Sequence, residues 1–176
     1  MGLTSARFPR THAPGKDIRS ATLDDARAIA AVYSPYITGT VITFEEHPIK
    51  PVEMARRIRA ITPRLPWLVL EQGGRVIGYA YAAPWRERTA YRHAVETTIY
   101  LESRFAGQGL GEKLYRALLD DLRQRGLHCA FGVIALPNPP SIALHEKCGF
   151  TKVGHLAEAG WKFEHWVDVG YWQLMF

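Results

Sequence analysis

The chain is poor in cysteine, lacks any clustered metal ligands and has no long apolar run. Its 176 residues include 2 cysteines, Cys129 and Cys148, and 7 scattered histidines. These cysteines have no metal-like spacing, so we expect reduced, buried thiols in a cytoplasmic protein rather than a disulfide framework or a metal site. No run approaches the roughly 18 apolar residues of a membrane span. Residues 1–16 also lack the apolar centre of a secretory signal.

The charge is positive but dispersed. The formal net charge of +5 comes from 22 basic and 17 acidic residues, and the arginines stand in ones and twos rather than in a stripe. Charge therefore does not predict a nucleic-acid partner, and a small polyanionic cofactor would suit it equally well. The composition, 47% hydrophobic and 22% charged, is typical of one globular domain. We interpret residues 1–16 as a flexible basic leader and 17–176 as the domain.

The periodicity of apolar residues predicts an α/β protein. Thr22, with Asp25 three residues on, begins an expected helix, and residues 52–61 form a second, amphipathic one. Gly73-Gly74 between two β-rich runs predicts a hairpin. The remaining expected elements are a strand over 93–102, a helix from 110 to a stop at Gly126, a strand over 128–135, a short helix over 138–149, and strands over 151–156 and 166–175. We expect a twisted mixed β-sheet with helices on both faces.

The segment "RFAGQGLGEKLYRALLDDL", residues 104–122, places three glycines directly before a helix. Each glycine costs about 0.5–1 kcal/mol relative to alanine inside an element. Backbone N–H groups and the positive end of the helix dipole converge on an anion at such a point. A P-loop would need Lys and Ser/Thr after the last glycine, where Glu112 stands, and the spacing is not that of a dinucleotide fingerprint. The pattern predicts another kind of phosphate loop, with a plain tight turn as the alternative.

Two segments together resemble the GNAT superfamily of acyl-CoA-dependent N-acetyltransferases. The pyrophosphate loop of that superfamily, R/Q-x-x-G-x-G/A, aligns with residues 106–111, where Ala106 replaces the usual Arg or Gln. "NPPSIALHEKCGF" is similar to the helix that packs beside the pantetheine arm. The phrases "W-x-x-R-x-A-Y" and "W-x-D-V-G-[YF]-W-Q" resemble the phosphinothricin and methionine sulfoximine (sulfone) acetyltransferase branch. This resemblance spans roughly residues 18–176 and implies a single-domain GNAT fold, acetyl-CoA as co-substrate and a homodimer.

Two residues are the predicted catalytic groups. Glu96 is a carboxylate within the apolar strand "AVETTIY", and the resemblance implies that it is the general base. Burial would raise its pKa, whereas the alternative is a structural ion pair with a nearby arginine. His145 stands where the superfamily often has the tyrosine that protonates the departing thiolate. The resemblance implies an imidazole acid, and a structural or substrate-contacting histidine is the alternative.

The resemblance also implies two sets of binding residues. The cofactor set is Thr98, Ile99, Tyr100, Ala106, Gly107, Gln108, Gly109, Leu110, Gly111, Asn138 and Ser141. The acceptor set is Phe44, Trp85, Arg86, Glu87, Arg88, Tyr91, Val95 and Thr97. Arginine forks suit the carboxylate of an amino acid acceptor. A solvated charged loop and aromatic core packing are the alternatives for this second set.

The predicted function is direct transfer of acetyl from acetyl-CoA to the α-amino group of a small amino acid analogue, such as phosphinothricin, methionine sulfoximine or methionine sulfone. An acetyltransferase for a peptide N-terminus or another amine is one alternative. A non-catalytic module that binds CoA, a nucleotide or nucleic acid is the alternative from a different class. We expect no metal, no nucleic-acid partner and no membrane association.

Overall fold

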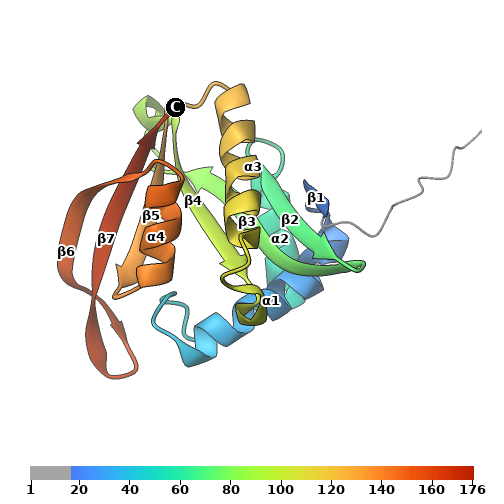
Figure 1. Cartoon of the computed structure of the whole chain (residues 1–176), viewed down its shortest axis with the longest axis horizontal. Coiled ribbons are helices and arrows are strands. Elements are labelled where there is room, and N and C mark those ends of the chain that lie inside the picture. Colours follow the sequence, from blue (N-terminus) through green and yellow to red (C-terminus); the bar gives the residue numbers. More distant parts are fainter. Residues whose placement is uncertain (1–16) are drawn as a thin grey trace, which may run out of the picture.

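A seven-stranded mixed sheet with the strand order β1-β2-β3-β4-β5-β7-β6 organises the structure (Figure 1). The structure is a computed structural model that describes residues 17–176, so the leader predicted for 1–16 lies outside the described residues. The strands are β1 Asp17–Ser20, β2 Trp67–Gln72, β3 Arg75–Pro84, β4 Ala94–Leu101, β5 Cys129–Leu136, β6 Thr151–Lys162 and β7 His165–Met175. The helices are α1 Ala26–Gly39, α2 Pro51–Ile61, α3 Leu110–Gln124 and α4 Pro139–Lys147.

The strand pairing confirms the predicted mixed sheet. β4 and β5 are parallel, and the other neighbouring strands are antiparallel. The hairpin between β2 and β3 turns at Gly73 and Gly74, with φ of +59° and +73°. Two successive positive φ values match the twist of the flanking strands, which is why Gly-Gly serves here.

Helices cover both faces of the sheet, as predicted. One core lies between α1, α2 and the face of the sheet that carries Trp67 and Tyr79. The second core lies under α3, whose Leu110, Leu114, Leu118 and Leu122 are buried. Figure 1 shows α3 and α4 over the same face of the sheet. The four-residue spacing of these leucines therefore identified the buried side of α3 correctly.

β4 parts from β5 after three residue pairs. The ladder between them runs only from Ala94↔Cys129 to Glu96↔Phe131. From Thr97 onward, that edge of β4 has no strand partner among residues 17–176. The parallel strands diverge, and the gap between them is where the candidate site lies.

Three features differ from the sequence-based expectation. β1 was not predicted, because a four-residue strand with one apolar residue carries almost no alternation. The helix expected after Thr22 begins with a 3₁₀ turn over Leu23–Asp25, and α1 follows it from Ala26 to Gly39. β6 runs to Lys162 rather than ending near residue 156, because an irregularity between Leu156 and Gly160 hides its alternation. Glu158, at φ +50°, lies in that irregularity.

Candidate active site

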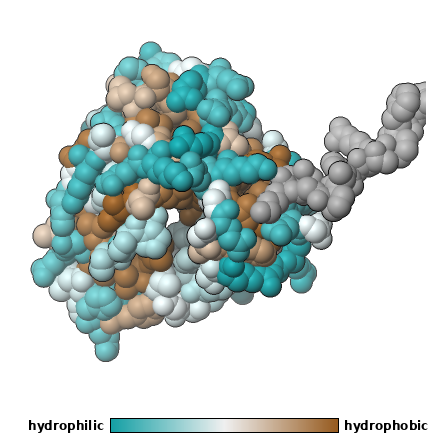
Figure 2. Space-filling model, viewed as in Figure 1, coloured by the Kyte–Doolittle hydropathy of each residue, from teal (hydrophilic) through white to brown (hydrophobic). Residues whose placement is uncertain are grey.

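Two adjoining cavities occupy the divergence of β4 and β5. One, of about 290 Å³, contains Glu96 and His145 in its lining. The other, of about 440 Å³, is lined by the glycine loop and one side of α4. They share Ile42, Ile99, Tyr100, Asn138 and Ser141. In Figure 2 a narrow opening lies between α4 and the beginning of α3.

The glycine loop forms the end of this site that can bind an anion. Gly107, Gly109 and Gly111 all line the larger cavity. Gly107 and Gly109 have φ of +74° and +73°, a conformation that other L-residues rarely adopt. Gly109 is also the N-cap of α3, so the first N–H groups of this helix are available to an anion. This cradle fits a diphosphate such as that of acetyl-CoA.

Most of the predicted cofactor residues lie along the two cavities. The larger cavity is lined by Ile99, Tyr100, Ala106, Gly107, Gly109, Gly111, Asn138 and Ser141. Thr98 lines the smaller one. Gln108 and Leu110 line neither: the Gln108 side chain donates to Arg104 O at 3.2 Å, and Leu110 is buried in the core. The unpartnered edge of β4 faces a slot in which a peptide-like pantetheine arm can form main-chain hydrogen bonds.

Glu96 lies half-buried on β4, at the margin of the smaller cavity. Its carboxylate makes no hydrogen bond or ion pair with the described residues, so the alternative of a structural ion pair is not formed within 17–176. Burial raises the pKa of Glu96, and the charge of Arg86 opposes that rise. This confirms the predicted direction for the carboxyl group.

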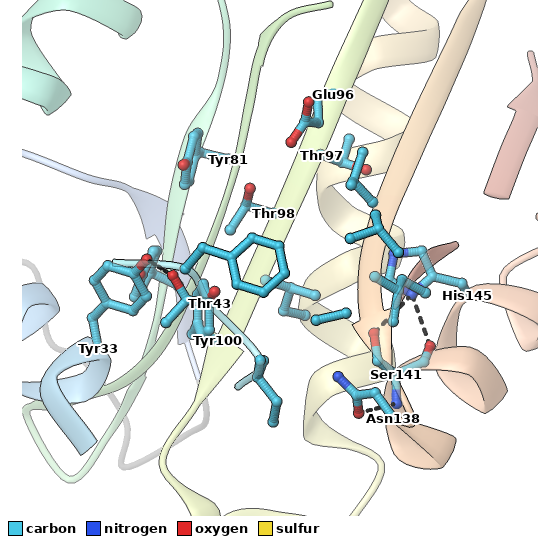
Figure 3. A pocket seen from close by; sticks show the side chains of 18 of the residues that line it. Tyr33, Thr43, Tyr81, Glu96, Thr97, Thr98, Tyr100, Asn138, Ser141 and His145 are labelled. Carbon is cyan, nitrogen blue, oxygen red and sulfur yellow. Dashed lines mark hydrogen bonds between the residues drawn. The ribbon is translucent and has the colours of Figure 1, made fainter. Parts of the chain in front are cut away.

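His145 lies across the cavity from Glu96, in α4. Figure 3 shows Glu96, Thr98 and Tyr81 on one side, and His145, Ser141 and Asn138 on the other. His145 Nδ1 lies 2.8 Å from Ser141 O. A carbonyl oxygen only accepts, so Nδ1 carries the proton and Nε2 is the unprotonated nitrogen of the neutral ring. Burial lowers the pKa of His145, which favours this neutral form.

The predicted acceptor residues separate into different places. Phe44 and Thr97 line the cavity with Glu96. Trp85 stacks on Phe131, with ring centroids 4.4 Å apart. A separate cavity of about 470 Å³, at the beginning of β4, is lined by Arg86, Glu87, Arg88, Tyr91 and Val95. In the structure these five residues do not share a cavity with Glu96.

Aromatic residues that we did not predict form a wall beside Glu96. The rings of Trp67, Tyr79 and Tyr81 stack on one face of β2 and β3. The ring centroids of Trp67 and Tyr81 are 4.1 Å apart. All three line the smaller cavity, as does Tyr33 of α1. The Nε1 of Trp67 is buried without a hydrogen-bond partner among the described residues. The signal was the two-residue spacing of Tyr79 and Tyr81, which puts both side chains on the face that carries Glu96.

The loop between α1 and α2 forms the roof of this cavity, and Gly160 and Lys162 of β6 contact this loop and the end of α1. Phe44 packs directly on Gly160, where any Cβ would overlap its ring. Lys162 is buried, and its Nζ donates to Ile37 O and Thr43 O at 2.7 Å each. Ile37 O belongs to the last turn of α1, where a cation is favourable. The sequence offered one hint, a lysine within the aromatic phrase "GWKFEHW".

Two kinds of feature were searched for within residues 17–176. No group of three or more His, Cys, Asp or Glu side chains could hold a metal ion there. No helix of that part of the chain is long and apolar enough to cross a membrane.

Comparison with known proteins identifies relatives that are all acetyltransferases. The model of the acetyltransferase (GNAT) family matches residues 26–150. A phosphinothricin N-acetyltransferase from Streptomyces viridochromogenes is 41% identical over 160 residues, which are 91% of this chain and 87% of that protein. An L-methionine sulfoximine/L-methionine sulfone acetyltransferase from Pseudomonas aeruginosa is 34% identical over 162 residues, covering 89% and 92%. A phosphinothricin acetyltransferase from Sinorhizobium meliloti, solved with acetyl-CoA, is 37% identical with a TM-score of 0.88, covering 92% and 88%.

Proposed function

Because this chain belongs to the acetyltransferase (GNAT) family, we propose that its substrate is the α-amino group of a small amino acid analogue and that Glu96 is the general base. Phosphinothricin, methionine sulfoximine and methionine sulfone are the acceptors that the relatives' names suggest. Acetyl-CoA is the co-substrate. The observation that carries the proposal is Glu96 itself, an unpartnered, half-buried carboxylate at the cavity that adjoins the glycine cradle.

In this proposal Glu96 takes the proton that the acceptor ammonium must lose, directly or through a water molecule. Burial raises the pKa of Glu96, which makes it a stronger base than an exposed carboxylate. The neutral amine then forms a C–N bond to the thioester carbonyl carbon, and the C–S bond breaks. A main-chain N–H of the unpartnered β4 edge, at Thr98 to Tyr100, stabilises the negative charge on the carbonyl oxygen.

His145 is proposed to protonate the departing thiolate. This step needs a proton on Nε2, because Nδ1 is already bonded to Ser141 O. Since burial lowers the pKa of His145, its acid form is populated only below the ordinary range for histidine. A rate that depends on this acid therefore falls as pH rises through the lowered pKa.

The arginines before β4 are proposed to bind the acceptor carboxylate. Arg86 acts electrostatically on Glu96, which supports a position near the reacting amine. Arg88 and Tyr91 line the adjacent cavity of about 470 Å³. From this neighbouring cavity, the two arginine forks can bind the carboxylate while the amine reaches Glu96.

We also propose that the enzyme is a cytoplasmic homodimer. The homodimer is implied by the sequence resemblance, and the exposed aromatic side chains of β6 and β7 offer a surface for it. The cytoplasmic location is supported by Cys129 and Cys148, which are both free and buried.

Free-thiol release from acetyl-CoA tests the function. The acceptor panel holds L-phosphinothricin, L-methionine sulfoximine, L-methionine sulfone, common amino acids and a short peptide, with wild type and Glu96→Gln. We expect turnover with the sulfoximine-type acceptors and a fall in kcat of about 100-fold in the variant. The control is Glu102→Gln, which should retain full activity. Glu102 is a carboxylate just beyond β4 that pairs with Arg75.

Each other result has a definite meaning. Unchanged turnover in Glu96→Gln would remove this residue as the base and leave the enzyme class standing. Release with the peptide alone would move the acceptor to a peptide N-terminus. CoA binding without release from any acceptor would leave only a binding module.

A further inference from the structure

Asp168 of β7 is the acidic residue of the phrase W-x-D-V-G-[YF]-W-Q, and the proposed mechanism gives it no role. It stands opposite the irregularity of β6. The flanking strand pairs are Leu156↔Val169 and Gly160↔Val167. Three residues of β6, 157–159, are therefore opposite Asp168 alone. At this point β6 contains two more residues than a regular strand needs, as in a large β-bulge.

Both carboxylate oxygens of Asp168 contact β6. Oδ1 accepts the backbone N–H of Glu158 at 2.8 Å, and Oδ2 lies 2.7 Å from His155 Nε2. The Glu158 N–H, more than the His155 ring, lowers the pKa of Asp168, which keeps the carboxylate charged. Glu158 has a φ of +50°, a conformation that residues other than glycine rarely adopt. Asp168 thus satisfies a backbone donor at the point where β6 is strained.

The irregularity determines how far β6 reaches along β7. Two extra residues displace the following part of β6 by about 7 Å, at about 3.3 Å per residue. Because two is an even number, the side chains stay on the same face of the sheet. In a regular strand, Gly160 would stand opposite His165 instead of Val167. The bulge therefore changes where a β6 side chain lies along β7, and not which face it occupies.

The displaced part of β6 contacts the roof of the smaller cavity. A Cβ at Gly160 would overlap the Phe44 ring. Lys162 Nζ donates to two main-chain carbonyls, one at the end of α1 and one in the loop after it, at 2.7 Å each. Contacts this close cannot survive a displacement of several ångströms. Since Phe44 lines the cavity that contains Glu96, the register of β6 determines the space beside the proposed base.

We propose that Asp168 is a positioning residue for acceptor binding, because it stabilises the β6 irregularity that places Phe44 over the acceptor. Asp168 lines neither of the two cavities at the divergence of β4 and β5, so it acts through β6. The inference rests on the proposed acceptor site beside Glu96. Acetyl-CoA belongs to the adjoining cavity with the glycine loop, so its KM is the internal reference.

Steady-state kinetics of the full-length protein with the best acceptor of the panel test this role. In Asp168→Ala the acceptor KM should rise about fivefold, whereas kcat and the KM for acetyl-CoA should stay within about twofold. Asp168→Asn keeps an oxygen that accepts the Glu158 N–H and should match wild type. His155→Gln is the matched control, because it removes the other partner of Asp168 on the same face of the hairpin. It should also match wild type.

A glycine at position 158 provides a rescue. Glycine adopts a φ of +50° without strain, so Glu158→Gly needs the carboxylate less than the natural residue does. Added to Asp168→Ala, it should return the acceptor KM to within about twofold of wild type. Absence of this recovery would show that Asp168 does not act through the strained turn, and it would overturn the proposal.

Hydrogen exchange tests the same role without an acceptor. The amides of residues 40–46, in the loop between α1 and α2, should exchange about tenfold faster in Asp168→Ala and at the wild-type rate in His155→Gln. If no acceptor is turned over by any variant, the proposed function fails, but this measurement still decides the role of Asp168.

Three results would overturn the proposal. They are an acceptor KM within twofold of wild type in Asp168→Ala, an equal rise in the KM for acetyl-CoA, and unchanged exchange of the loop. An equal effect of His155→Gln would assign the loss to the surface of the hairpin and would overturn it too. If Asp168→Ala is too unstable to assay, Asp168→Glu replaces it with the same expectations, since it keeps the charge but displaces the oxygens from the Glu158 N–H.

Discussion

Glu96 and His145 line one cavity, and burial changes their pKa values in opposite directions. Burial disfavours the charged form of each group, so it raises the pKa of the carboxyl and lowers that of the imidazole. A buried carboxylate that still ionises at neutral pH is a good general base. Arg86 supports this ionisation, because its positive charge opposes the rise in the Glu96 pKa.

The pH profile of kcat/KM tests that charge effect. We expect an acid limb centred above 4.5, the ordinary pKa of a glutamate, since the raised pKa keeps Glu96 protonated to higher pH. Arg86→Gln removes the opposing charge, so the limb should move further toward neutral pH. Arg92→Gln removes a positive charge from the same loop and should leave the midpoint unchanged, since Arg86 is the charge that acts on Glu96. An identical midpoint in Arg86→Gln would contradict the assignment of this limb to Glu96.

Gly132 of β5 is the residue that makes room for the imidazole. A Cβ at Gly132 would overlap His145 Cδ2 and Nε2. Gly132→Ala should therefore displace the ring, lower the free energy of unfolding by about 1–3 kcal/mol and reduce kcat. Urea unfolding and the thiol assay measure both effects.

Gly154→Ala in β6 is the matched control for this substitution. A Cβ there meets Tyr171 at an ordinary 3.7 Å, so stability should change by less than about 1 kcal/mol. Equal behaviour of the two alanine variants would mean that the contact with His145 has no particular cost.

At the scale of elements, β6 determines where the roof of the cavity lies. Gly160 and Lys162 are two residues apart, so both face the loop that follows α1. Gly160 receives the Phe44 ring, and the ammonium group of Lys162 joins the end of α1 to Thr43. The strand thereby positions a loop that is more than a hundred residues away in sequence.

Lys162→Met tests this arrangement. The substitution keeps an apolar side chain but leaves Ile37 O and Thr43 O without their donor, so the free energy of unfolding should fall by about 1–3 kcal/mol. A loosened roof should also raise the acceptor KM more than it lowers kcat. Lys152→Met, in the exposed first part of β6, should alter neither. A variant with lower stability but an unchanged KM would show that Lys162 does not position the roof.

At the scale of the whole molecule, β6 and β7 expose an aromatic surface. Trp161, Phe163 and Trp166 are 50%, 53% and 56% exposed, and the two indoles pack edge to face. Apolar side chains gathered on one hairpin are typical of a protein–protein contact. The proposed homodimer would bury them.

Light scattering coupled to size-exclusion chromatography tests this interface. Wild type should have the mass of a dimer, and Trp166→Glu should have that of a monomer, because the new charge would be buried without a partner. Val52→Glu introduces the same charge at a 75% exposed position on α2 and should remain dimeric. A monomeric wild type would contradict the proposed dimer, and a dimeric Trp166→Glu would place the interface elsewhere.

Local pattern was sufficient for most of the fold. The leucine spacing of α3, the Gly73-Gly74 turn and the position of Glu96 on β4 all follow from neighbours a few residues apart. β1 and the end of β6 were missed for the same reason, since one strand is too short for a pattern and the other is interrupted. The glycine cradle was also visible locally, because its conformation depends on the glycines themselves.

The sequence by itself determined the class of fold, the glycine loop before α3 and the position of Glu96 on β4. Only the tertiary structure decided which distant residues share a space. It placed Trp67 and Tyr81 beside Glu96, put Arg88 in a neighbouring cavity, and brought Lys162 to the end of α1. The physical reason is that periodicity specifies which face a side chain occupies, whereas the twist of the sheet and the divergence of β4 from β5 specify what that face meets.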